Sequence, residues 1–291
     1  GNTENNVLGR GMRLDSKLNV SEIARRGKFS VINPNYKYSG NEVRFTAEST
    51  RTSKMTTFGY DSSKTGFSLG TTFEQYEDIF ISPDLSAYYE SLSTNDNASK
   101  ALQQQEGTYI DTELRYSVIQ DKRDQSFKPT EGYRVSFNQK LPLYSESPSL
   151  INGLDYSAYH SFSDNLIGSL RFHGRSINSI SSSEDVKLSE RLSIPGRYLR
   201  GFEAGRIWPV DAADYVGGNY ATALGFNAGL PNLLPNLTNA DISLFLDTGN
   251  VWGVDYDDGI DESNKIRSAF GDSVYWFTVT GLSIKPIWRW R

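Results

Sequence analysis

The stretch Ile110-Asp111-Thr112-Glu113-Leu114-Arg115-Tyr116-Ser117-Val118 alternates between mostly apolar residues and polar or charged ones. Successive side chains of a β-strand point to opposite faces, so this period of two predicts a strand with one apolar and one charged face. Met12–Val20 follows the same pattern, with Leu14 and Leu18 on the side opposite Lys17. We therefore expect a chain built from β-strands.

Eleven further segments alternate in the same way, which gives about thirteen predicted strands. Connections such as Ser39-Gly40 are short, whereas others, such as 93–107 and 180–214, are long. Short turns at one rim and long loops at the other predict an up-and-down antiparallel sheet, and a sheet of this length must close. We expect one barrel domain over residues 1–291. The eleven segments are Lys28–Tyr38, Glu42–Arg51, Thr65–Tyr76, Ile79–Tyr89, Tyr133–Leu143, Asp155–Ser163, Leu166–Ser176, Asn219–Leu230, Asp241–Trp252, Ile266–Thr278 and Leu282–Trp290.

The composition excludes several classes of protein. No run of 18 apolar residues occurs among the 291, so a transmembrane helix is excluded. The absence of cysteine excludes a disulfide framework, thiol catalysis and cysteine-ligated zinc. A net charge of -5 and a pI near 5.2 argue against a nucleic-acid partner, which needs clustered positive charge.

Alternation alone does not separate a membrane barrel from a soluble barrel or sandwich, because the apolar face can meet lipid or a core. Three observations favour the membrane barrel. Charges of both signs, such as Arg44 and Glu48, stand in mid-strand. Segments of about ten residues match a tilted membrane strand. Aromatic residues also cluster at segment ends, as interfacial girdles do: Tyr36, Tyr38, Tyr88, Tyr89, Trp252, Trp276, Phe277, Trp288 and Trp290.

The segment Tyr198–Pro209 does not alternate and carries Arg200-Gly201-Phe202. A glycine between an arginine and an aromatic residue suits a loop that folds inward and packs closely. Four other motifs accompany it in order. Over residues 6 to about 278, the set resembles the barrel domain of the BamA-type outer-membrane protein assembly factors. The four motifs are Asn6–Gly11, Asp121–Arg134, Tyr215–Tyr220 and Leu244–Trp252.

This resemblance implies a location in the bacterial outer membrane and a role as the core of an insertase. Such a core assists the folding and insertion of client β-barrel proteins by templating their edge strands and perturbing the membrane. The implied partners are outer-membrane lipids, client outer-membrane proteins, and assembly lipoproteins or a second chain that supplies missing strands. The alternative is a passive or engineered pore or scaffold barrel derived from the same family.

We expect no enzymatic activity, metal or cofactor. The sequence contains no Gly-x-Ser-x-Gly elbow, and the acidic run Asp255–Glu262 lacks the full spacing of a calcium loop. Asp121–Arg134 is predicted to form a tight turn, with Gly132 at positive φ.

The resemblance also implies a site. It places the loop 177–216 inside the lumen, with the Arg200 guanidinium against the strand wall. Asp247 matches an acid of the family and is the candidate partner in a bidentate pair. A second family acid aligns with Asn227, so we expect a weaker clamp. The simpler alternative is that Arg200 anchors the loop and contacts no client.

Both ends depart from the family pattern. We expect the periplasmic POTRA domains, the first barrel strand and the usual last strand to be absent from this sequence. The candidate edge strands are then the two outermost predicted segments, and an exposed edge can accept an incoming strand by β-augmentation. Their outward residues are Met12, Leu14 and Leu18 at one end and Leu282, Ile284, Trp288 and Trp290 at the other.

Overall fold

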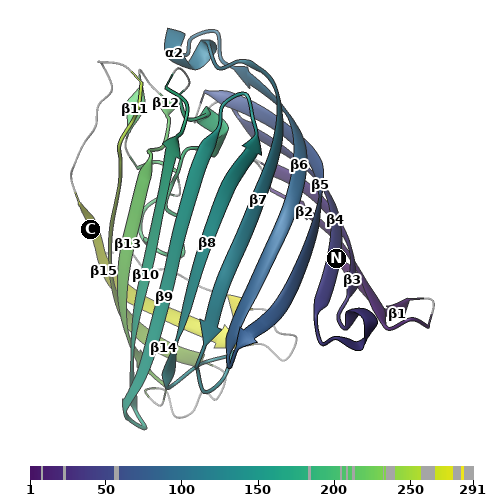
Figure 1. The fold of residues 1–291 in the computed structure, drawn as a ribbon. Helices are drawn as coiled ribbons and strands as arrows, with labels where there is room; N and C mark the ends of the chain where they lie inside the picture. The colour runs from purple at the N-terminus through teal and green to yellow at the C-terminus, as the bar shows by residue number, and fades with distance from the viewer. Residues whose placement is uncertain are drawn as a thin grey trace.

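Fourteen strands form one antiparallel sheet in the computed structural model (Figure 1). It describes residues 1–7, 9–21, 24–55, 59–182, 185–203, 205–207, 209–211, 214–231, 233, 240–256, 266–277 and 283–284. Neighbours in the sheet follow chain order, with β13 beside β10. The strands are β1 (Asn2–Val7), β2 (Met12–Val20), β3 (Ala24–Asn33), β4 (Glu42–Lys54), β5 (Tyr60–Tyr76), β6 (Ile79–Thr94), β7 (Gly107–Asp121), β8 (Gly132–Tyr144), β9 (Ser149–Ser163), β10 (Leu166–Ser179), β13 (Tyr220–Leu230), β14 (Ala240–Trp252), β15 (Arg267–Phe277) and β16 (Ser283–Ile284).

Long connections gather at one end of the sheet. They carry the short helix α2 (Lys100–Gln103), the 3-10 turn η2 (Leu188–Glu190) and a separate pair of strands, β11 (Val210–Asp211) and β12 (Asp214–Tyr215). Figure 1 shows α2, β11 and β12 together at this long-loop rim. Among the described residues, no helix is both long and apolar enough to cross a membrane.

The opposite rim has shorter turns. The predicted turn between Asp121 and Gly132 joins β7 to β8, and Gly132 adopts φ +89°. A Cβ at Gly132 would lie 2.0 Å from the carbonyl oxygen of Lys122, so the turn requires glycine there. In outer-membrane barrels the short turns face the periplasm and the long loops face outward.

The observed strands differ from the predicted ones at two places near the N-terminus. The strand predicted over Lys28–Tyr38 ends at Asn33, because the chain turns through η1 (Tyr36–Tyr38), where Lys37 and Tyr38 have positive φ. Residues 2–7, which were not predicted as a strand, form β1. The sheet thus holds the thirteen predicted strands and one more.

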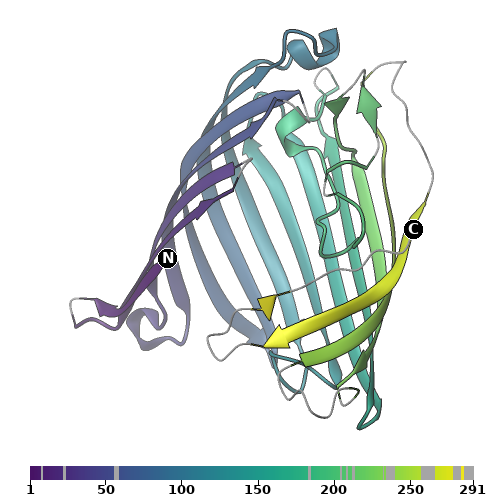
Figure 2. The same ribbon diagram turned by 180° about the vertical axis from the view of Figure 1, so that it is seen from behind.

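The edge strands also need correction. Met12, Leu14 and Leu18 lie on β2, which pairs with β1 on one side and β3 on the other, so β1 is the edge at this end. At the other end Ile284 lies on β16 and pairs with Trp276. Leu282, Trp288 and Trp290 lie outside the described residues. No described pairing joins β1 to β16, and Figure 2 shows the sheet open between its first and last strands.

The strand alternation separates two faces. The concave face borders a cavity of about 590 Å³ lined by charged residues of several strands, including Lys28, Arg44 and Glu48. The outward face exposes apolar side chains that stand side by side in register, such as Phe45, Leu69 and Leu85. Charges inside and apolar groups outside are the arrangement of a membrane barrel with a polar lumen.

Tyr88 departs from the predicted aromatic girdle. Its side chain is buried on the concave face, where its hydroxyl donates to Glu48 Oε1 at 3.0 Å. Gly66 lies opposite Tyr88, and a Cβ there would come 2.4 Å from the ring, so the glycine makes room for it. Tyr89, the next residue, is 52% exposed and belongs to the outward face.

Candidate functional site

Arg200 is held against β14 by a bidentate ion pair with Asp247. Its Nε donates to Asp247 Oδ2 at 2.6 Å and its Nη2 donates to Oδ1 at 2.7 Å. The backbone N–H of Arg200 also donates to Oδ2, at 3.0 Å. The Asp247 side chain is fully buried. Because a bidentate pair fixes both distance and orientation, it ties the loop backbone to this strand.

The strand wall is shaped to receive this pair. Gly225 lies opposite Asp247, where a Cβ would stand 2.8 Å from the carboxylate. The Arg200 guanidinium carbon lies 3.8 Å from the centroid of the Phe245 ring, a cation–π contact. Gly201 adopts φ +87°, which side-chain-bearing residues rarely do. The motif thus combines a cation with the backbone turn that lets it reach the wall.

Asn227 supplies a further contact from β13. Its Oδ1 accepts from Arg200 Nη2 at 2.7 Å, and its Nδ2 donates to Ser169 Oγ at 3.1 Å. A second cation, Arg171, places its Nη2 3.6 Å from Asp247 Oδ1. The position that lacks a carboxylate therefore keeps its hydrogen bond to Arg200. A weaker clamp remains a prediction.

Phe202 belongs to the apolar side of the same loop. It packs against a buried cluster that joins loop residues to β13 and β14. The cluster consists of Ile194, Leu199, Ile207, Ala221, Ala223 and Val251.

The loop itself starts later than the predicted residue 177, because β10 continues to Ser179.

Tyr198 anchors the loop two residues before Arg200. Its ring stacks on His173 with centroids 4.2 Å apart, and its hydroxyl donates to Asp155 Oδ1 at 3.0 Å. Asp155 also contacts His173 Nδ1 at 2.6 Å and accepts from Arg175 Nη2 at 2.5 Å. Tyr198 therefore docks on β9 and β10.

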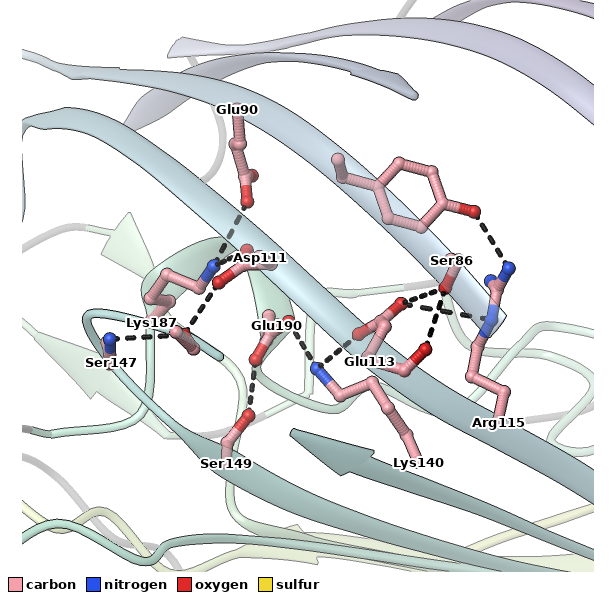
Figure 3. Close-up of polar contacts among 12 residues, drawn as sticks. Ser86, Glu90, Asp111, Glu113, Arg115, Lys140, Ser147, Ser149, Lys187 and Glu190 are labelled. Carbon is pink, nitrogen blue, oxygen red and sulfur yellow. Dashed lines mark hydrogen bonds and ion pairs between the residues drawn. The ribbon is translucent and has the colours of Figure 1, made fainter. Parts of the chain in front are cut away.

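Lys187 fastens the root of the loop to a different part of the wall (Figure 3). Its Nζ donates to Asp111 Oδ2 at 2.5 Å and to Glu90 Oε2 at 3.4 Å, and its side chain is 2% exposed. Burial lowers the pKa of Lys187, but the negative charges of Glu190, Glu90 and Asp111 raise it by more than burial lowers it. The pKa is therefore above its usual value. The lysine remains charged inside the structure and links the loop to β6 and β7.

Glu190 makes the reciprocal contact with β8 and β9. It accepts from Lys140 Nζ and from Ser149 Oγ, both at 2.5 Å (Figure 3). Burial raises the pKa of Glu190, whereas Lys140, Lys187 and Lys64 lower it, to about 2 in balance. The loop is thus held at its root by β6 to β9 and at its tip by β13 and β14.

The matching family is the Omp85 superfamily domain, which covers residues 6–282. The chain belongs to the Omp85 superfamily. Sequence motifs predicted a BamA-type barrel, and this Omp85 match confirms that resemblance and the outer-membrane location.

Two proteins similar to this Omp85 chain carry the name BamA. Over 192 residues, it is 25% identical to the outer membrane protein assembly factor BamA of Neorickettsia risticii (strain Illinois), a match that covers 64% of this chain and 26% of the relative. Its fold matches the crystal structure of BamA from Haemophilus ducreyi lacking POTRA domains 1-3, with a TM-score of 0.84 and 18% identity. That match covers 99% of this chain and 63% of the other. The predicted antiparallel up-and-down β-barrel fold is confirmed.

Proposed function

We propose that this Omp85 chain is the core of an outer-membrane protein insertase. It would assist the folding and membrane insertion of client β-barrel proteins, without covalent chemistry. The observation that carries the proposal is the edge of β1, which pairs with β2 on one side and has no partner on the other among the described residues. Unpaired backbone N–H and C=O groups are a template for an incoming strand.

In this proposal residues 1–291 act as one barrel domain, and the loop after β10 binds to the inner wall and stabilises it. Arg200, Gly201 and Phe202 act through conformation: Arg200 fastens the loop tip to Asp247, while the outer edges of β1 and β16, unpaired among the described residues, accept a strand. The partners would be outer-membrane lipids, client barrel proteins, and assembly lipoproteins or a chain that supplies further strands. Membrane perturbation would accompany strand pairing.

The test is catalysis of folding. The purified chain would be reconstituted into liposomes, and the folding rate of an unrelated outer-membrane barrel would be followed by its unboiled migration on a denaturing gel. We expect faster folding with the chain present and a partial loss with Arg200→Ala. Arg206→Ala is the matched control, because Arg206 lies in the same loop with its side chain 47% exposed. An unchanged client folding rate would refute the proposal.

A passive pore or scaffold is the second candidate, and the charged cavity of about 590 Å³ favours it. It predicts ion conductance across a planar bilayer with no acceleration of client folding. Ion conductance without faster client folding would select the pore. Faster client folding without ion conductance would select the insertase.

A further inference from the structure

Two arginines stand directly opposite each other near the long-loop rim. Arg25 on β3 is the register partner of Arg51 on β4, and both side chains are exposed. Like charges placed opposite each other in a sheet repel and destabilise it. Neither guanidinium has a hydrogen bond or ion pair with any residue that the structure describes. Among the residues that the structure describes, the pair therefore lacks a partner that would offset its repulsion.

Both arginines belong to the outward face. Lys28 and Arg44 line the cavity, so the residues of opposite parity on β3 and β4, Arg25 and Arg51 among them, point away from it. Arg26 shows the contrast, because it lines the cavity and its Nε donates to Thr50 Oγ1 at 3.2 Å. Adjacent residues of one strand thus place one arginine in the lumen and one on the membrane side.

The surface around the pair changes from apolar to polar along the strands. The next outward row towards the membrane centre holds Gly27, Ser49 and Thr65 beside the pair, and the exposed Tyr89 and Ile110 on β6 and β7. The row after it contains the exposed Phe29 and Phe67. The row of Arg25 and Arg51 begins with Val20 on β2 and continues past the pair with hydroxyl side chains, those of Ser63, Ser91 and Thr108. Paired cations with hydroxyls above an apolar band lie where lipid headgroups meet acyl chains.

We propose that Arg25 and Arg51 form a binding site for a phosphate-bearing lipid headgroup in the membrane leaflet on the long-loop side. Guanidinium groups bind phosphate oxygens through paired N–H donors, and one phosphate between the two cations offsets their repulsion. The acyl chains of the same lipid lie along the apolar rows below, which is why the ligand is a lipid and not a free anion. The site depends on the barrel crossing a membrane and is independent of insertase activity.

The test measures lipid retention. The full chain would be purified from phosphatidylcholine nanodiscs containing a minor fraction of lipid A, and the bound lipid would be quantified by native mass spectrometry. We expect lipid A to be enriched on the wild-type protein. Arg25→Gln combined with Arg51→Gln should reduce that retention about tenfold or more, since two charge-assisted contacts are lost. Arg25→Lys with Arg51→Lys should give an intermediate loss, because lysine keeps the charge without the planar fork.

Arg26→Gln is the matched control. It removes one charge at the same level of the same strand but from the lumenal face, so lipid A retention should stay at the wild-type value. Wild-type protein without enrichment of lipid A overturns the proposal, as does full retention by the glutamine pair. Equal loss in Arg26→Gln would also overturn it, because bulk charge would then explain the binding. If the glutamine pair does not fold, the lysine pair decides, and unchanged retention there rejects the site.

Discussion

Gly225 on β13 lies directly opposite Asp247 on β14, and its missing side chain provides the space for the carboxylate that holds Arg200. A Cβ at Gly225 would stand 2.8 Å from Asp247 Oδ1 and 3.3 Å from Arg171 Nη2. The space that Gly225 leaves on β13 therefore allows the carboxylate on β14 to hold the loop.

Gly225→Ala should loosen the loop tip, because the carboxylate must move away from the added methyl group. Overpacking of this kind costs about 1–3 kcal/mol. Trypsin cleavage of the loop, which carries several arginines, should become faster in the folded protein. Gly229→Ala is the control, because a Cβ there meets its nearest atom at an ordinary 3.4 Å. Equal cleavage rates in the two variants would contradict the spatial role of Gly225.

Asp247→Asn should release the loop more strongly than any change at Asn227. It removes the charge that faces Arg200 and Arg171, and loss of one partner of a buried pair costs about 3–5 kcal/mol. Asn227→Asp should keep the loop attached, because two acids would then face the two arginines and Ser169 could donate to the new carboxylate. The temperature at which the unboiled gel band disappears measures both effects. A lower temperature for Asn227→Asp than for Asp247→Asn would refute this ranking.

Tyr198→Phe should weaken the loop modestly, because it keeps the stack on His173 and loses the hydrogen bond to Asp155. A hydrogen bond to a charged group is worth about 1.5–3 kcal/mol. Combining Tyr198→Phe with Asp155→Asn should cost less than the sum of the single changes, since both remove the same contact. Strict additivity in the band-disappearance temperature would show that the hydroxyl does not act through Asp155.

The fold could be predicted from the sequence because alternation is a local property. Each of the thirteen predicted segments has a strand in the sheet, Leu282–Trp290 within the described residues only as Ser283–Ile284, and charged mid-strand residues such as Arg44 and Glu48 line the cavity. β1 was missed because Asn2–Val7 is almost entirely polar and carries no alternation. Tyr88 does not belong to the predicted aromatic girdle. Alternation along β6 points its side chain into the lumen, and its position at the end of a predicted segment does not change that.

The site was only partly visible in the sequence. Arg200 and Asp247 could be paired through motifs, whereas Lys187 and Glu190 lie in a loop without periodicity or motif. Their partners, Asp111 and Lys140, come from β7 and β8, which the loop reaches only when it folds against the concave face of the sheet. Such a charge network depends on the spatial order of strands, and no spacing along the chain encodes it.

Glu190 should make the loop root sensitive to acid. Its pKa is lowered from 4.5 to about 2, so its ionised form stabilises the fold fully above about pH 4.5, and that contribution is lost as the pH falls towards 2. Glu190→Gln removes the ionisation but leaves a side chain of similar size beside Lys140 and Ser149. The gap in band-disappearance temperature between wild type and Glu190→Gln should therefore be largest at about pH 6 and close as the pH approaches 2. Subtracting the variant cancels the titration of other carboxylates, so a gap that stays constant over this range would show that folding does not lower the pKa of Glu190.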